Sequence, residues 1–317
     1  MRAPLAPAAR VGVVVVHFGD PTPTLACLRA LRDDPSVSER AVVVVDNSGT
    51  LPASFLPGEV ALPCPDNPGF GAGVNRGVLA LGEGPFGALV ILNNDVEIAP
   101  GYLAAALGAL HDPAVGAAAG PLYLDRIGGR LWYAGGGVNF LTGTVRQSTS
   151  GVDAVRARRV GFIPGAALAV HPAVWREVGG FNTAYLLYNE DLDLCLRLRR
   201  RAIALRFVPE MAAVHRVGAS TGSAARSPLY LEYTAANRLR PFRPLAFRLY
   251  LALIHTGYVG LRALWHRVAR GGVAGRQAAR ALLRGHARAL GGIRRGPSEA
   301  CSDRVVDSRR KRANANP

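Results

Sequence analysis

The sequence of 317 residues is long enough to bury a large core, either as one α/β domain or as a domain with an appendage. Its four cysteines are far apart and form no C-x-x-C pair: Cys27, Cys64, Cys195 and Cys301. This spacing excludes a zinc cluster and a disulfide framework, and it is typical of a reducing compartment. The apolar run 11–16 is short and leads into polar residues, so it indicates a strand rather than a secretory signal.

The net charge of +16 is concentrated in the last third of the chain. Residues 1–217 hold 19 Arg against 18 Asp and Glu, whereas residues 218–317 hold 19 Lys and Arg against four acids. Such a basic segment indicates a polyanionic partner, either a nucleic acid or an anionic lipid surface. Nucleic-acid-binding segments interleave lysine, arginine and exposed aromatic residues. This one has a single lysine and a largely apolar helical stretch, so we expect an anionic membrane surface and no nucleic acid.

The first half of the chain alternates strands and helices as parallel α/β proteins do. Continuous apolar runs predict strands at 11–16, which is covered on both faces, at 41–49 and at 88–95. Helices are predicted at 23–32, within 67–81 after a glycine-rich turn, and at 101–110. Because the strands end in polar residues, the pattern indicates an open sheet with its ligand site at the carboxyl edge, and it makes Asp46 and Asp95 candidate site residues.

The second half begins with a segment rich in glycine, 120–165, for which we expect irregular or hairpin structure. A helix is predicted from about Asp191, with acids in its first turn and arginines in its last, in accord with the helix dipole. A strand is predicted to follow within 203–209.

Beyond residue 240 the sequence predicts two helices with basic stripes. Arg248, His255 and Arg262 recur every seven residues on an otherwise apolar helix, and arginines of a second helix recur at 276, 280, 284 and 288. A cationic stripe argues against a transmembrane span, whereas basic amphipathic helices suit a membrane interface. We therefore expect a membrane-associated helical region at 241–296 and a disordered tail at 297–317.

Several polar motifs follow the predicted strands, and each is ambiguous when taken alone. The sequence "LNND" (92–95) ends a buried strand, where polar groups are costly unless they meet water, a ligand or a metal. It could also be an N-cap cluster, and "VDNSG" (45–49) could cap the next helix. "NPGFGAG" (67–73) suits a tight turn. Asp191 and His215 could each be structural.

The order of these motifs is far more specific than any one of them. A strand ending in DNSG is followed by N-x-G-F-G-x-G-x-N-x-G, a strand ending in LNND, G-G-F-N, Y-N-E-D-x-D-L-C-x-R and H-x-x-G. This order resembles the family 2 glycosyltransferases over roughly 10–240, and most closely their rhamnosyltransferase-type branch, which builds bacterial cell-surface polysaccharides. The resemblance implies a catalytic domain at 1–240 with the GT-A fold, an α/β fold with a mostly parallel sheet flanked by helices. The nucleotide-sugar donor would bind at the carboxyl edge, beside an acceptor groove.

The resemblance also implies a donor site. Asp46 would hydrogen-bond the nucleotide base, the glycine-rich turn would lie near the ribose, and the Gly165-Ala166 pair would border the sugar. The residues expected at the nucleotide sugar are His17, Phe18, Asp46, Asn67, Gly71, Asn75, Asn93, Asn94, Asp95, Gly165 and Ala166.

The resemblance implies a divalent metal, Mg²⁺ or Mn²⁺, beside the donor. The family's D-x-D motif falls on 93–95, so Asp95 would be a ligand, and Asn93 stands where many relatives carry an acid. His215 matches a histidine that binds the metal in some relatives. A hard cation would accept these groups together with phosphate oxygens and would stabilise the leaving nucleoside diphosphate.

The catalytic base implied by the resemblance is Asp191, which would take the proton of the attacking acceptor hydroxyl, with Glu190 orienting the acceptor or the base. Direct displacement inverts the anomeric centre. Asp193 points differently around the helix. Relatives carry an arginine where this chain has Ala236, so any contact made by that arginine would be lost or supplied by Arg238.

The expected protein is thus an inverting glycosyltransferase that moves a sugar, preferably from dTDP-rhamnose, to a lipid-linked saccharide. We expect it in the cytoplasm, attached peripherally to the inner face of the membrane. A nucleotidyltransferase that makes nucleotide sugars is one alternative, but "HFGDPTP" (17–23) replaces the glycine-rich loop that such enzymes place after the first strand. An inactive relative that acts as a binding partner is another, given Asn93 and Ala236.

Overall fold

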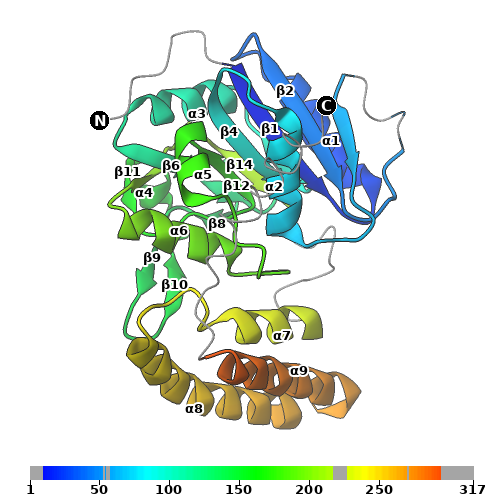
Figure 1. Cartoon of the computed structure of the whole chain (residues 1–317). Helices are drawn as coiled ribbons and strands as arrows, with labels where there is room; N and C mark the ends of the chain where they lie inside the picture. Colours follow the sequence, from blue (N-terminus) through cyan, green and yellow to red (C-terminus); the bar gives the residue numbers. More distant parts are fainter. Residues whose placement is uncertain (1–9, 53, 55–57, 217–226, 270, 294–317) are drawn as a thin grey trace, which may run out of the picture.

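The computed structural model describes residues 10–52, 54, 58–216, 227–269 and 271–293, and it has two parts (Figure 1). An α/β domain lies above a layer of three helices, drawn in yellow and orange: α7 (Pro228–Asn237), α8 (Leu245–Ala269) and α9 (Gly272–Gly291). The predicted tail, 297–317, and Cys301 lie outside the described residues. Within the described part, Cys27, Cys64 and Cys195 are buried free thiols, as the cysteine spacing predicts.

The α/β domain is built on an eight-stranded sheet. In chain order its strands are β1 (Arg10–His17), β2 (Arg40–Asp46), β3 (Val60–Pro63), β4 (Phe86–Asn93), β6 (Val115–Ala119), β11 (Arg158–Val160), β12 (Ala167–Val170) and β13 (Ala204–Phe207). The spatial order is β11-β13-β6-β12-β4-β1-β2-β3. Strands β4, β1, β2 and β3 are parallel, as predicted, whereas β12 is antiparallel to both neighbours, β4 and β6.

The valine run of β1 forms the centre of the core. Val13, Val14 and Val15 are all fully buried, which requires that both faces of the sheet be covered because successive side chains point to opposite faces. The covering helices are α1 (Pro21–Arg32), α2 (Phe70–Leu81), α3 (Tyr102–His111), α4 (Gly151–Ala154), α5 (Pro172–Val178) and α6 (Glu190–Arg200). The helix predicted from about Asp191 is therefore α6, which begins one residue earlier.

Two smaller sheets complete the domain. One has the order β5-β14-β7-β8 and contains β5 (Val96–Ile98), β7 (Leu122–Tyr123), β8 (Leu131–Tyr133) and β14 (Ala213–His215). The other is the hairpin of β9 (Gly136–Asn139) and β10 (Thr144–Gln147), which lies in the glycine-rich segment where irregular or hairpin structure is expected. The hairpin extends from the α/β domain toward α8 (Figure 1), and the Tyr250 hydroxyl of α8 donates to the Leu141 carbonyl in its turn at 3.0 Å.

The polar stripe of α8 faces the protein, which corrects the interpretation of this stripe as the polar face of an interfacial helix. Arg248 and His255 are only 5% and 3% exposed. The buried side of α8 also carries small residues such as Ala252, Val259 and Ala263, and small side chains let α8 approach its neighbours closely. Most of the large apolar side chains of α8, although not Leu251, are exposed: Leu245, Leu249, Tyr250, Leu253, Tyr258, Leu261, Leu264, Trp265 and Val268.

The structure agrees with the predicted basic stripe of α9 but not with the predicted domain boundary at residue 240. Arg276, Arg280, Arg284 and Arg288 of α9 are exposed along one face. Helix α7 lies within the expected catalytic range 1–240, yet it packs against α9. In the described part of the chain, no helix is long and apolar enough to cross a bilayer.

Candidate active site

The polar ends of three neighbouring strands meet at one edge of the large sheet. His17 at the end of β1 lies opposite Asp46 at the end of β2, and Val16 lies opposite Asn93 at the end of β4. This is the carboxyl edge of the parallel strands, where ligands bind in open α/β sheets. The sequence therefore predicted this convergence correctly.

At this edge, Asp46 organises the loop that follows β2. Its Oδ1 accepts hydrogen bonds from the N–H groups of Ser48 (3.0 Å) and Gly49 (2.7 Å), and its Oδ2 accepts one from the N–H of Leu51 (3.0 Å). Burial favours the neutral carboxyl, but these donors outweigh burial and lower the pKa of Asp46. Asp46 is thus an ionised anchor of this loop.

His17 is fully buried and joins β1 to α1 and to the loop after β2. Its Nδ1 lies 2.6 Å from Thr24 Oγ1, and its Nε2 lies 3.0 Å from Thr50 Oγ1. Asn94 is also buried, and its amide donates to the same Thr24 hydroxyl at 3.1 Å. Burial lowers the pKa of His17, against the opposing charge of Asp46, so the imidazole is a neutral structural element.

The glycine-rich turn packs against the loop that leads into α6. A Cβ on Gly69 would lie 2.3 Å from the Leu186 carbonyl oxygen, and one on Gly71 would lie 2.9 Å from the Cβ of Phe181. The Asn75 amide donates to the Phe181 carbonyl at 2.7 Å, and its oxygen accepts from the Phe181 N–H at 2.9 Å. Gly71 and Asn75 therefore hold this loop in place.

A short chain of hydrogen bonds links β4 to the first turn of α6. The Asn93 N–H donates to the Ala166 carbonyl at 2.8 Å, and the N–H of the adjacent Gly165 donates to Asp191 Oδ2 at 3.2 Å. The Leu192 N–H donates to Asp191 Oδ1 at 2.7 Å. The strand end and the carboxylate of Asp191 are thus fixed relative to each other.

Glu190 and Asp191 form an acidic pair in which Glu190 is buried and Asp191 is half-buried. Burial, then the charge of Asp191, raises the pKa of Glu190 to about 8. Burial also raises the pKa of Asp191, although the N–H groups of Gly165 and Leu192 act in the opposite direction. Glu190 Oε2 is buried and has no hydrogen-bond partner among the described residues. Two carboxyl groups with different environments are suited to different protonation states near neutral pH.

Asp193 has a structural role, which the sequence did not predict. Its Oδ2 accepts from Arg197 Nε at 2.7 Å, and the same guanidinium donates to the carbonyls of Val178 and Gly180. Asp193 thus orients an arginine that ties α6 to the loop before Phe181.

The backbone just before the acidic pair is held by α7. Tyr188 and Asn189 have positive φ angles of 65° and 72°, which are unfavourable for residues with a side chain. The Asn237 amide donates to the carbonyls of Leu187 (2.8 Å) and Tyr188 (3.0 Å). Sequence reasoning missed this role, although Asn237 directly follows Ala236, the position where relatives carry an arginine. The guanidinium of Arg238 instead lies 5.7 Å from the ring centroid of Tyr258 in α8.

Asp95 and His215 are adjacent because β5 pairs with β14. The register places His215 opposite Val96, and His215 Nε2 lies 3.3 Å from Asp95 Oδ1. Both side chains are buried, and neither Asp95 Oδ1 nor His215 Nδ1 has a hydrogen-bond partner among the described residues. An imidazole and a carboxylate with uncommitted atoms suit a divalent cation completed by ligand oxygens. The described residues contain no group of three or more such side chains.

The remaining predicted residues lie around this edge. Phe18 is 42% exposed, and Asn67 is an exposed residue with φ of 39°. Glu97 pairs with Arg216 and so takes no part in the Asp95–His215 pair. The Gly218 position of the H-x-x-G motif lies outside the described residues.

The GT-A fold is shared with two solved glycosyltransferase structures. Mannosyltransferase PcManGT from Pyrobaculum calidifontis, in complex with GDP-Man and Mn²⁺, has a TM-score of 0.52 at 18% identity, covering 99% of this chain and 83% of that chain. GalNAc-T7 with UDP, GalNAc and Mn²⁺ has a TM-score of 0.50 at 15% identity, covering 73% of this chain. This chain spans about half (48%) of the GalNAc-T7 chain. The chain therefore has the GT-A glycosyltransferase fold.

The family follows from sequence comparison. The model of glycosyl transferase family group 2 matches residues 88–272, more than half of the chain. N-acetylglucosaminyl-diphospho-decaprenol L-rhamnosyltransferase of Mycobacterium tuberculosis is 30% identical over 209 residues, 57% of this chain and 68% of that protein. The chain belongs to glycosyl transferase family group 2 and is a rhamnosyltransferase-like glycosyltransferase. This membership contradicts the alternative of a nucleotidyltransferase.

Proposed function

We propose that this glycosyltransferase inverts the anomeric centre of a sugar taken from a nucleotide diphosphate, with Asp191 as the general base. The observation that carries the proposal is the connection from Asn93 at the strand end, through Ala166 and Gly165, to the Asp191 carboxylate. It holds a base beside the sheet edge where GT-A enzymes bind their donor. Gly165 and Ala166 would then border the donor sugar.

In the proposed reaction the acceptor hydroxyl oxygen bonds to the anomeric carbon while the bond from that carbon to the diphosphate breaks. The hydroxyl proton passes to Asp191, and the nucleoside diphosphate leaves with the bonding electrons. Because burial raises the pKa of Asp191, its carboxylate is a stronger base than an exposed aspartate. Glu190, with its pKa of about 8, keeps a proton near neutral pH and can donate a hydrogen bond to the acceptor.

A divalent cation fits beside Asp95 and His215, whose buried atoms lack other partners. When bound there, Mg²⁺ or Mn²⁺ would neutralise charge on the diphosphate. Both solved GT-A structures contain Mn²⁺, which supports this proposal. Asp46, which holds the loop after β2, would border the nucleotide, and its direct contact with the base stays a prediction.

We favour dTDP-rhamnose as donor and a saccharide linked through diphosphate to a polyprenol as acceptor. The mycobacterial relative supports this choice, because it is an L-rhamnosyltransferase that acts on N-acetylglucosaminyl-diphospho-decaprenol. A lipid-linked acceptor lies in a bilayer, so the enzyme must work at a membrane surface.

The exposed side of α8 supports peripheral attachment to that surface. Leu253, Leu261 and Val268 are 78%, 73% and 74% exposed, on a helix that is followed by the exposed arginines of α9. An apolar face beside basic residues suits insertion into the interface of an anionic membrane. Attachment at the inner face of the cytoplasmic membrane is part of the proposal.

The test is a donor screen with purified protein, Mg²⁺ or Mn²⁺, and dTDP-, UDP- and GDP-sugars, in which release of nucleoside diphosphate is measured. We expect dTDP-rhamnose to be consumed, more slowly with a chelator and not at all by the Asp191→Asn variant. Consumption of another donor would overturn the donor assignment. Failure to bind any nucleotide sugar would favour the inactive relative.

A further inference from the structure

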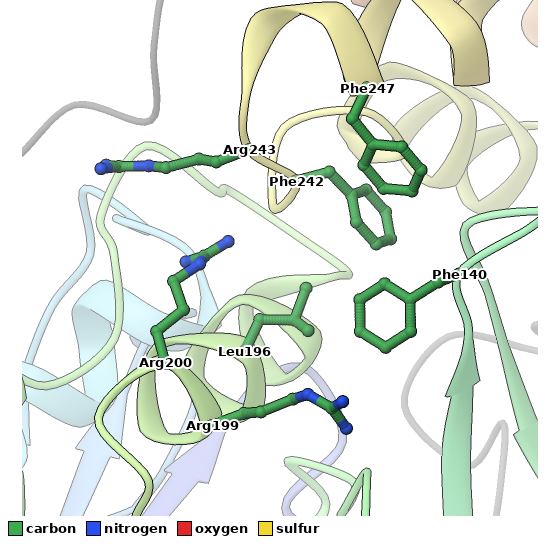
Figure 2. Close-up of a pocket in the computed structure, with 7 residues that line it drawn as sticks. All are labelled: Phe140, Leu196, Arg199, Arg200, Phe242, Arg243 and Phe247. Carbon is green, nitrogen blue, oxygen red and sulfur yellow. The ribbon is translucent and has the colours of Figure 1, made fainter.

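A pocket of about 400 Å³ lies beside α6, where this helix meets the β9–β10 turn and the start of α8 (Figure 2). Its lining combines two kinds of side chain. Phe140, Phe242, Phe247 and Leu196 form an apolar wall. Arg199 runs beside Phe140, whereas the side chain of Arg243 extends away from the phenylalanine rings on the side of Arg200 (Figure 2). The described residues that line the pocket include no acid.

The apolar wall is a packed aromatic cluster. The ring of Phe242 meets that of Phe140 edge-on at 6.4 Å between centroids, and that of Phe247 at 5.7 Å. Phe242 and Leu196 are 1% and 3% exposed, so the floor is fixed, whereas Phe140 is 39% exposed at the mouth. Such a wall suits an aliphatic or isoprenoid chain.

The arginines concentrate positive charge at the mouth of the pocket. The Arg199 guanidinium carbon lies 4.9 Å from the centroid of Phe140, and Arg200 donates to the Pro241 carbonyl at 2.6 Å. Burial lowers the pKa of Arg200, and the positive charge of Arg243 is the second cause. The guanidinium groups of Arg200 and Arg243 are therefore close enough to repel each other. An anion bound between them would relieve this repulsion, and planar guanidinium groups match the geometry of phosphate oxygens.

The pocket lies between the proposed base and the proposed membrane face. Asp191 is in the first turn of α6 and Arg199 is near its end, about 12 Å further along the helix axis. On the other side, Phe247 stacks on Tyr250, with 5.9 Å between centroids and an angle of 19°. Tyr250 is 43% exposed and belongs to the outer apolar surface of α8.

We propose that this pocket binds the junction between the diphosphate and the prenyl chain of the lipid-linked acceptor. The arginines hold the diphosphate, and the phenylalanines hold the first isoprene units as the chain passes to the bilayer. A soluble anion would not use the aromatic wall, and a neutral lipid would not use the three cations. The inference rests on the proposed function for the identity of the acceptor, but the ligand chemistry follows from the pocket itself.

The first experiment measures binding of farnesyl diphosphate, farnesol and inorganic diphosphate to the purified protein by titration calorimetry. We expect farnesyl diphosphate to bind at least about tenfold more tightly than either fragment, because only it uses both parts of the pocket. Equal affinities for farnesyl diphosphate and inorganic diphosphate would overturn the proposal.

Variants then locate the binding. Arg199→Gln/Arg243→Gln should weaken farnesyl diphosphate binding about tenfold or more, because charge-assisted hydrogen bonds are lost. Arg276→Gln/Arg280→Gln on α9 removes the same charge elsewhere and should leave the affinity unchanged. Phe140→Ser, at the exposed turn, should reduce the preference for farnesyl diphosphate and leave binding of inorganic diphosphate intact. An unchanged affinity in the pocket variants would overturn the assignment.

One further measurement distinguishes the acceptor's diphosphate from a lipid headgroup as the ligand of the pocket. Another distinguishes failure of the pocket assignment from failure of the proposed function. If Arg199→Gln/Arg243→Gln reduces binding to phosphatidylglycerol vesicles more than the α9 variant does, the pocket serves bulk lipid headgroups and the acceptor assignment fails. For Arg199→Gln/Arg243→Gln we expect vesicle binding like that of wild type, a raised KM for a prenyl-diphosphate-linked saccharide acceptor and an unchanged affinity for the nucleotide sugar. If the wild-type protein binds no nucleotide sugar, the proposed function fails, while the farnesyl diphosphate titration still decides the pocket.

Discussion

The α/β domain and the layer formed by α7, α8 and α9 distribute their polar and apolar residues in opposite ways. In the α/β domain, buried valines fill the sheet and polar side chains gather at one strand edge. In α8, Arg248 and His255 are buried while Leu253 and Leu261 are exposed. The first pattern is that of a folded core surrounded by water. The second leaves an exposed apolar surface, which is the arrangement that the proposed membrane attachment requires.

Hydrogen bonds also join the two regions, and we expect them to couple the helical layer to the site. Asn237, from the helical layer, holds the backbone before the acidic pair, and the β9–β10 turn of the α/β domain contacts Tyr250 of α8. The following predictions test the chemistry of one region, the coupling, the surface of the other region and the charge state of the site.

The largest expected effect separates two neighbouring acids of α6. Asp191→Asn should lower kcat by about 10²–10⁴, because a general base is lost, while the melting temperature stays close to wild type. Asp193→Asn should instead lower the melting temperature, since it breaks the contact with Arg197. Steady-state kinetics and thermal unfolding of both variants test this. Equal kcat values for the two variants would remove Asp191 from the role of base.

The coupling is tested by Asn237→Ala. The variant loses the amide that holds the Leu187 and Tyr188 carbonyls, so we expect a fall in kcat of about tenfold from misplacement of the acidic pair, with an unchanged KM for the donor. Thr234→Ala on the same helix is the control, because its hydroxyl donates within α7, to the Tyr230 carbonyl. Matching kcat values for these variants would show that the two regions work independently.

The surface of α8 is tested by Leu253→Asp/Leu261→Asp. We expect co-sedimentation with phosphatidylglycerol vesicles to fall about tenfold or more, because apolar insertion is replaced by charge repulsion. Unfolding free energy should change little, since both side chains are exposed. Leu79→Asp, at an equally exposed leucine of α2, is the control. Retained vesicle binding that disappears in high salt would assign the attachment to the arginines alone.

The smallest effect concerns pH and Glu190. Because burial raises the pKa of Glu190 to about 8, the folded state holds a proton that the unfolded state releases near its ordinary value of 4.5. The stability from this proton is complete below pH 4.5 and is lost as pH rises toward and through 8. The melting temperature of the Glu190→Gln variant should therefore fall less than that of wild type between pH 5 and 8. If the melting temperatures of wild type and variant changed equally with pH, Glu190 would not be protonated in the folded state.

Sequence reasoning predicted β1, β2, β4 and β13, the polar ends of the first three and most helices, because these depend on short-range periodicity. It also identified Asp95 and His215 as a pair, although only the β5–β14 register brings them together. It did not predict that His17 and Asn75 hold loops through internal hydrogen bonds, since a polar side chain near a ligand site and one that supports it look alike in sequence. The inward direction of Arg248 and His255 depends on where α8 packs, which periodicity leaves undetermined.

The reversed strand β12 has a consequence for how such an enzyme can diversify. Because β12 runs against β4, it is the beginning of this strand that reaches the ligand edge, with Gly165 and Ala166 just before it. The connection before β12 can therefore change in length or shape while the ladder of hydrogen bonds between Ala167–Val170 and β4 stays in register. Under the proposed function, in which Gly165 and Ala166 border the donor sugar, a preference for another sugar could be introduced at this connection without refolding the sheet.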